Sequence, residues 1–122
     1  MVRILVVDDE MEICDFLRNY FTDKGYNVDS ANNGKEAIAQ ARIIHPDIVL
    51  LDIRMPGITG IDVLRQLREE ENPPKVIMIT AVEDPKVIQE AKRLGAEDYI
   101  VKPFALDYLD TVVLRKISTL LH

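Results

Sequence analysis

Short, continuous runs of branched apolar residues constrain the fold of this chain more than any other feature. Residues 48–51 read Ile-Val-Leu-Leu and are followed at once by Asp52, with Pro56 and Gly57 close behind. A run without alternation indicates a strand buried on both faces, as in a parallel sheet. The Pro and Gly predict a loop after it. Because ligands gather outside the carboxyl ends of parallel strands, Asp52 is a candidate functional residue.

Further apolar runs alternate with segments of helical periodicity. Strands buried on both faces are expected at residues 3–7, 48–51, 75–80 and 98–101, and one half-exposed strand, the only one that looks like a sheet edge, at 26–31. Helices are expected at about residues 11–24, 35–44, 61–71, 83–94 and 106–121. This alternation predicts one α/β domain over residues 1–122. The expected fold is a flavodoxin-like, doubly wound (βα)5 three-layer sandwich with five parallel strands in the order 2-1-3-4-5.

Charge and composition exclude several classes of partner. The net charge is −6 and the basic residues form no cluster, which argues against direct binding of nucleic acid or of an anionic membrane. No apolar run approaches the ~18 residues that a membrane helix needs, so we expect a cytoplasmic protein. Cys14 is the single cysteine and therefore forms neither an internal disulfide nor, by itself, a zinc site.

Polar side chains follow four of the expected strands. Asp8 and Asp9 follow the first, Asp52 the third, Thr80 ends the fourth and Lys102 follows the fifth. In the order 2-1-3-4-5 these strands are neighbours, so the five side chains should converge. Each residue alone has an ordinary explanation as a cap, a turn residue, a strand end or a surface charge. Their joint arrival at one edge makes that combination a poor explanation.

Three carboxylates in one place need compensating charge. Each pair repels by about 4 kcal/mol at 4 Å and an effective dielectric constant near 20. Lys102 supplies one positive charge, and a hard divalent ion such as Mg²⁺ would supply the remainder, whereas the lack of His and Cys disfavours zinc. An ion and a lysine together could stabilise a phosphoryl group, and a neighbouring carboxylate could accept that group as an acyl phosphate.

Four motifs resemble the receiver domain of bacterial two-component response regulators, in the family's order and spacing. They are Val6-Val7-Asp8-Asp9-Glu10, Leu50-Leu51-Asp52-Ile53-Arg54-Met55-Pro56-Gly57, Ile79-Thr80-Ala81 and Val101-Lys102-Pro103-Phe104. The resemblance spans essentially the whole chain. It implies a phosphoprotein of phosphorelay signal transduction that depends on Mg²⁺, for which Mn²⁺ could substitute.

The resemblance also implies a role for each site residue. Asp52 would be the phosphorylated residue, and Thr80 and Lys102 would contact the phosphoryl oxygens. The metal ligands would be Asp8, Asp9, Asp52 and the backbone carbonyl of Arg54. Thr80 and Tyr99 would form the conformational switch, and the Lys102-Pro103 peptide bond would be cis. Glu10 is read either as an acid that lies beside the metal ligands without binding the ion or as an acid of the first helical turn.

The implied partners are a histidine kinase or a histidine phosphotransfer protein as donor. Phosphorylation would alter the face made by residues 83–94, 98–101 and 106–121, which could bind an effector or a second copy of the chain. Tyr108 and Val112 are expected off the inner stripe of the last helix, as exposed apolar residues at i and i+4 that either mark this docking face or are scattered surface residues.

Three rival functions stay open from the residues. A flavodoxin-type cofactor binder would need a phosphate-cradling loop after the first strand, where this chain has Asp8, Asp9 and Glu10. An aspartate-nucleophile phosphatase usually has its nucleophile on the first strand and a cap domain. A receiver-like interaction module would not need all five site residues. We therefore expect a signalling phosphoacceptor that promotes its own phosphorylation and dephosphorylation, and no conventional turnover enzyme.

Overall fold

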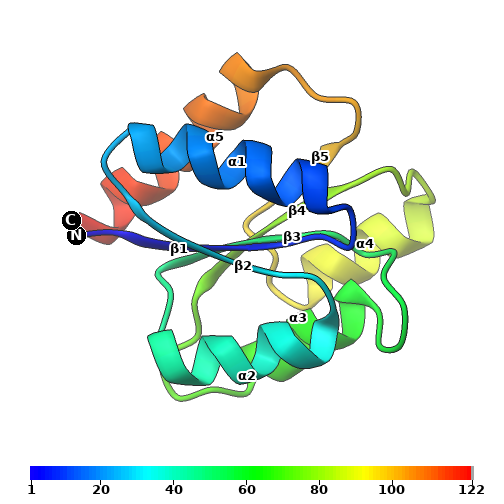
Figure 1. Cartoon of the computed structure of the whole chain (residues 1–122). Helices are drawn as coiled ribbons and strands as arrows, with labels where there is room; N and C mark the ends of the chain where they lie inside the picture. The colour runs from blue at the N-terminus through cyan, green and yellow to red at the C-terminus, as the bar shows by residue number, and fades with distance from the viewer. Residues whose placement is uncertain (122) are drawn as a thin grey trace.

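The computed structural model describes the backbone of residues 1–121 and the side chains of residues 1–119. Five strands and five helices alternate along the chain, and the strands lie side by side with their arrows pointing the same way (Figure 1). The strands are β1 (Arg3–Val7), β2 (Asn27–Ala31), β3 (Ile48–Leu51), β4 (Lys75–Thr80) and β5 (Asp98–Val101). The helices are α1 (Met11–Asp23), α2 (Gly34–Ile44), α3 (Gly60–Arg68), α4 (Pro85–Arg93) and α5 (Leu106–Leu121).

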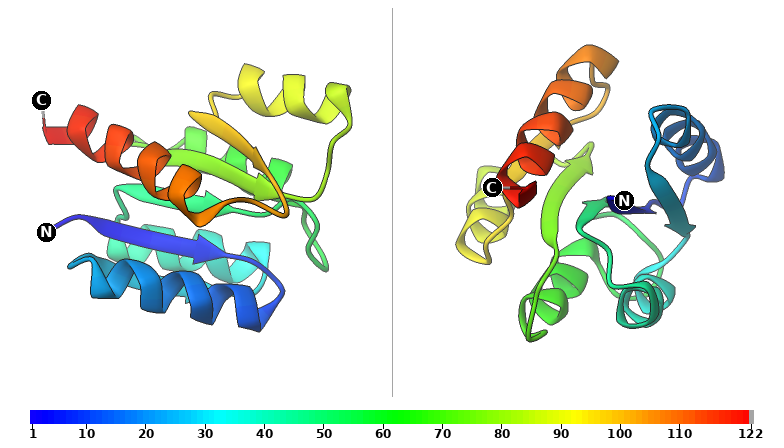
Figure 2. Two further views of the ribbon diagram at one scale, coloured as in Figure 1. Left: turned by 90° about the horizontal axis from the view of Figure 1, so that it is seen from above. Right: turned by 90° about the vertical axis from the view of Figure 1, so that its left-hand side faces the viewer.

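The sheet is wholly parallel, and its strand order is β2-β1-β3-β4-β5. Helices α1 and α5 cover one face, and α2, α3 and α4 cover the other, so the molecule has three layers (Figures 1 and 2). Each face has its own apolar core: Leu17, Phe21 and Leu109 pack on one side, and Val63 and Leu67 on the other. The flavodoxin-like fold and the strand order predicted from the sequence are confirmed.

Local signals in the sequence explain where the helices begin. The Asn33 side chain accepts a hydrogen bond from the Glu36 amide at 2.8 Å and caps α2. Thr59 and Asp62 form a capping box at the start of α3. Asp84 caps α4, with Pro85 at the first helical position.

The sequence pattern and the predicted strand order disagreed about one edge of the sheet. Residues 98–101 did not look like an edge strand, whereas the order 2-1-3-4-5 places them at an edge, and the structure has that order. The Asp98–Val101 strand has four residues, which is too short to display an alternation of buried and exposed side chains. Only Ile100 of this strand is fully buried, while the other three residues are partly exposed, as an edge position allows.

One correction concerns α5. Val112 was expected at the surface together with Tyr108, but Val112 is 0% exposed whereas Tyr108 is 50% exposed. Val112 lies three residues after the buried Leu109 and next to Val113, so it belongs to the helix face that packs on the sheet. Helical periodicity also predicts Leu120 on the inner face of this helix, but Leu120 lies outside the residues whose side chains are described. The proposed pair of exposed apolar residues therefore does not exist.

Within residues 1–121, no helix is both long and apolar enough to cross a membrane.

Candidate functional site

Parallel pairing in register brings the ends of β1, β3, β4 and β5 to one edge of the sheet. Val7 is paired with Leu51, and Thr80 with Val101. The next residues continue the pairing, since the Asp52 amide donates to the Val7 carbonyl at 2.9 Å and the Lys102 amide to the Thr80 carbonyl at 2.9 Å. The predicted convergence of the site residues is therefore present in the fold.

Lys102 links two of these carboxylates. Its ammonium Nζ lies 2.6 Å from Asp8 Oδ2 and 3.2 Å from Asp52 Oδ2, with Glu10 Oε1 further away at 3.8 Å. Asp8 and Asp52 are only 3% and 5% exposed, so this contact is shielded from water. Backbone amides orient both acids, because Glu10 N–H donates to Asp8 and Ile53 N–H donates to Asp52.

The electrostatics follow from burial beside other charges. Burial raises the pKa of Asp8, and the hydrogen bond from Lys102 only partly offsets this rise. For Lys102, burial lowers the pKa, but the hydrogen bond to Asp8 and the charge of Asp52 outweigh burial and raise the pKa overall. One ammonium group thus faces an excess of negative charge, as the sequence predicted.

An open cavity of about 380 Å³ lies beside this contact. Its walls are Asp9, Glu10, Asp52, Arg54, Thr80, Ala81 and Lys102. Asp9 and Arg54 are exposed at its rim, while Thr80 is fully buried, and its hydroxyl accepts a hydrogen bond from the Val82 amide at 3.3 Å. Every predicted site residue except Asp8 and Tyr99 therefore lines this cavity. Asp8 contacts Lys102, which is one of the lining residues.

The donor atoms at this edge fit a hard divalent cation. Carboxylate oxygens of Asp8, Asp9 and Glu10 lie within 4.8 Å of one another, the one such acidic group found among the described residues. Oxygen donors of this kind suit Mg²⁺, and one carboxylate of the group is buried while two face the solvent. Glu10 precedes the first turn of α1 and lies close to the two aspartates, which agrees with the reading that places it beside them.

Tyr99, on β5, is not among the residues that line this cavity. Its hydroxyl donates a hydrogen bond to the Val82 carbonyl at 2.7 Å, and its ring packs on the core beneath α4. Burial, together with the charge of Asp52, raises the pKa of the phenol. Through Val82, Tyr99 and Thr80 contact the same residue of the β4–α4 loop. The Lys102-Pro103 peptide bond is cis, as the resemblance implied.

Gly60 is a residue of this site that sequence reasoning missed. It begins α3, and a Cβ added to it would meet the carbonyl group of Asp52. The sequence signal was only a glycine after Thr59, which reads as an ordinary start of a helix.

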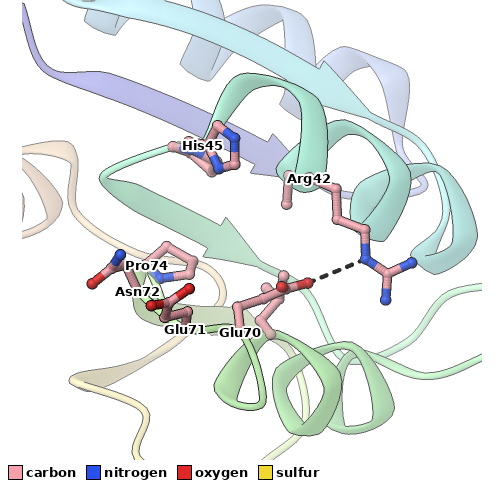
Figure 3. Close-up of a pocket in the computed structure, with 9 residues that line it drawn as sticks. Arg42, His45, Glu70, Glu71, Asn72 and Pro74 are labelled. Carbon is pink, nitrogen blue, oxygen red and sulfur yellow. Dashed lines mark hydrogen bonds and ion pairs between the residues drawn. The ribbon is translucent and has the colours of Figure 1, made fainter.

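A second cavity, of about 370 Å³, lies at the opposite edge of the sheet (Figure 3). Its rim carries the Arg42–Glu70 ion pair, joined at 3.1 Å, together with His45, Glu71 and Asn72. The floor consists of Ala41, Pro46, Leu67 and Pro74. Because its polar side chains are largely exposed and Arg42 and Glu70 already pair with each other, this hollow offers less for chemistry than the carboxyl edge.

Comparisons with known proteins agree with this geometry. The response regulator receiver domain family model matches residues 4–114. Regulatory protein AtoC of Escherichia coli K12 is 44% identical over 116 residues, which cover 95% of this chain and 25% of AtoC. Transcriptional regulatory protein ResD of Bacillus subtilis is 46% identical over 103 residues, or 84% of this chain and 42% of ResD. The chain thus spans a quarter to less than half of these two relatives.

Solved structures are similar over nearly their whole length. Chemotaxis protein CheY4 of Vibrio cholerae has a TM-score of 0.88 and 32% identity, covering 94% of this chain and 98% of CheY4. Response regulator TrrA of Thermotoga maritima, solved in complex with Mg²⁺-BeF, has a TM-score of 0.85 and 37% identity, covering 95% of this chain and 99% of TrrA.

These similarities do not favour a flavodoxin-type binder, a phosphatase or an inert interaction module. The family model and the relatives agree with the motifs and with the fold. The chain belongs to the response regulator receiver domain family, whose members are signalling proteins of phosphorelays.

Proposed function

We propose that Asp52 accepts a phosphoryl group from a phosphohistidine of a histidine kinase or of a histidine phosphotransfer protein. The observation that carries the proposal is the buried contact of Lys102 with Asp52 and Asp8 beside an open cavity. One oxygen of Asp52 would form the new bond to phosphorus while the bond from phosphorus to the imidazole nitrogen breaks. Hydrolysis by water would later release inorganic phosphate and restore the carboxylate.

The chain's own residues would divide the work. The Ile53 amide, which donates to Asp52 Oδ1 at 2.7 Å, would hold the acceptor carboxylate in one orientation. Lys102 and the Thr80 hydroxyl would neutralise and bind the phosphoryl oxygens. Asp8, Asp9, Asp52 and the Arg54 carbonyl would hold Mg²⁺, for which Mn²⁺ could substitute. A bound ion supplies positive charge that offsets the charge of the acids and of the transferring group.

The switch would use the β4–α4 loop. When Thr80 turns its hydroxyl toward the phosphoryl group, the hydrogen bond from the Val82 N–H to this hydroxyl would break. Tyr99 would be affected as well, because its hydroxyl donates a hydrogen bond to the Val82 carbonyl. Phosphorylation would thereby shift an existing equilibrium and change the face made by α4, β5 and α5. That face would control an effector or a second copy of the chain, without direct contact between this domain and nucleic acid. A single domain over residues 1–122 and a cytoplasmic location complete the proposal.

Phosphorylation at Asp52 can be tested with a small donor. Acetyl phosphate and Mg²⁺ should add one base-labile phosphoryl group to the wild-type chain, and Asp52→Asn should abolish this labelling, as measured by intact mass. Asp107→Asn, which changes an exposed aspartate on α5, is the matched control and should be labelled normally. Labelling that persists in Asp52→Asn would refute the assignment, and sustained turnover of small phosphate esters would favour a phosphatase.

A further inference from the structure

Gly60 packs directly against the main chain of the acceptor residue. A Cβ added at Gly60 would lie 2.7 Å from Ile53 Cα and 2.8 Å from the Asp52 carbonyl carbon, and well inside contact distance of the Asp52 carbonyl oxygen. Carbon atoms that are not bonded to each other pack at about 3.5–4.0 Å. All of these obstacles are backbone atoms, so a change of side-chain rotamer would not relieve the overlap.

Hydrogen bonds hold the same stretch of chain from both sides. The Asp52 amide donates to the Val7 carbonyl at 2.9 Å within the sheet, and the Gly60 amide donates to the Ile53 carbonyl at 2.9 Å. Between these two contacts, the Ile53 amide donates to the Asp52 carboxylate. The start of α3 therefore fixes the peptide group whose N–H orients the acceptor oxygen.

The start of α3 is itself well held. The Asp62 amide donates to Thr59 Oγ1 at 3.3 Å, and the Thr59 amide donates to Asp62 Oδ2 at 3.2 Å. Gly60 lies inside this capping box, directly after Thr59, and is buried. Because the helix start has little freedom, any added atom at Gly60 must displace the Asp52–Ile53 peptide group.

We propose that Gly60 is a positioning residue for phosphorylation: by lacking a Cβ, it lets α3 hold the Asp52–Ile53 peptide group in the orientation that aims the Asp52 carboxylate at Lys102. This inference rests on the proposed function of Asp52. It predicts that Gly60→Ala, which keeps the Asp52 carboxylate itself, turns that carboxylate away from the cavity.

The chain offers a matched control at Gly34. Both glycines are buried and occupy the first position of a helix. A Cβ at Gly34 would also be crowded, but by side chains, Ile58 at 2.5 Å and Val63 at 2.7 Å. Gly34→Ala therefore perturbs packing to a comparable degree without meeting the main chain of Asp52.

Two readouts separate positioning from loss of stability. In the folded Gly60→Ala chain, the rate of labelling by acetyl phosphate and Mg²⁺ should fall about tenfold or more, as expected when a reacting group is misplaced. The Ile53 amide signal in a nitrogen–proton correlation spectrum should move, because its hydrogen bond to Asp52 changes. Gly34→Ala should keep its labelling rate within about twofold of wild type and leave the Ile53 signal in place.

The inference is overturned if Gly60→Ala is labelled at the wild-type rate with an unmoved Ile53 signal, or if Gly34→Ala has equal effects. Should Gly60→Ala fail to fold, loss of the α3 cap in Thr59→Ala is compared with loss of the α2 cap in Asn33→Ala. The first must slow labelling and shift Ile53 more than the second, and equal effects reject the proposal. If wild type is not labelled at all, the proposed function fails, while the Ile53 signal still decides whether Gly60 positions Asp52.

Discussion

The ammonium group of Lys102 stabilises two buried carboxylates, those of Asp8 and Asp52, at the carboxyl edge of the sheet. Asp8 and Asp52 are almost fully buried, and each has an oxygen within 3.2 Å of the lysine nitrogen. Without a cation, burial and mutual repulsion would favour their protonated forms. The pKa of Asp8 is raised chiefly by burial, and the hydrogen bond from Lys102 does not fully offset this rise. A divalent cation at the exposed rim would supply further positive charge.

Replacing Asp9 by Ala should weaken Mg²⁺ binding without loss of folding. Asp9 is exposed, and its oxygens approach those of Asp8 and Glu10. Removal of one ligand should raise the dissociation constant about tenfold or more, which can be measured by calorimetric titration. Glu12→Ala, which removes an exposed acid from the first turn of α1, is the control and should change the affinity little. Equal affinities in wild type and Asp9→Ala would contradict the ligand role.

At the scale of secondary-structure elements, α5 shows that two residues one helical turn apart can differ in whether their side chains reach the core. Its buried residues Leu109, Val112, Val113 and Ile117 recur at intervals of three and four. This stripe is wider than the single row expected from the sequence, because α5 packs on the sheet beside α1 and shares one core with it. Tyr108 lies on the other side and is half exposed.

Two substitutions one helical turn apart should therefore differ in their effect on stability. Val112→Ala should lower the free energy of unfolding by about 2 kcal/mol, because it removes buried methyl groups and leaves a cavity. Tyr108→Ala should change it by no more than about 0.5 kcal/mol, as usual at exposed sites. Urea unfolding of both variants measures the difference. Similar losses for the two would mean that the placement of α5 on the sheet is incorrect.

At the scale of the whole molecule, the β4–α4 loop connects the acid edge with the α4–β5–α5 face. The Val82 N–H donates a hydrogen bond to the Thr80 hydroxyl, and the Val82 carbonyl accepts one from the Tyr99 hydroxyl. The loop is therefore hydrogen-bonded both to β4 and to the edge strand β5. Because β5 is an outer strand, a shift of its side chains need not disturb the rest of the sheet. The loop is therefore well placed to transmit a local change.

Loss of the Tyr99 hydroxyl should weaken this connection while sparing the chemistry. Tyr99→Phe keeps the ring but removes the 2.7 Å hydrogen bond, worth about 1 kcal/mol. Labelling of Asp52 should stay within about twofold of wild type. Addition of beryllium fluoride and Mg²⁺ should shift the amide signals of α4 and α5 less than in wild type. Tyr20→Phe on α1 is the control, and loss of labelling in Tyr99→Phe would show that Tyr99 belongs to the reacting site.

Much of the site followed from the sequence because strand ends need no tertiary detail to be located. Asp8, Asp52, Thr80 and Lys102 each stand at the end of an apolar run, and a parallel sheet must bring such ends together. Gly60 could not be recognised in this way, since its importance lies in the distance between a helix start and a strand end. The proximity of Glu10 to Asp8 and Asp9 likewise depends on how the chain turns into α1.

The sequence by itself determined the class of fold, the edge of the sheet that holds the candidate site, and the residues that meet there. It did so because apolar periodicity distinguishes strands from helices, and because right-handed crossovers leave few ways to order five parallel strands. Only the tertiary structure decided that Val112 is core and that Lys102 lies nearer to Asp8 than to Asp52. Those outcomes depend on where each helix and loop lies across the sheet, and packing of distant segments sets that position.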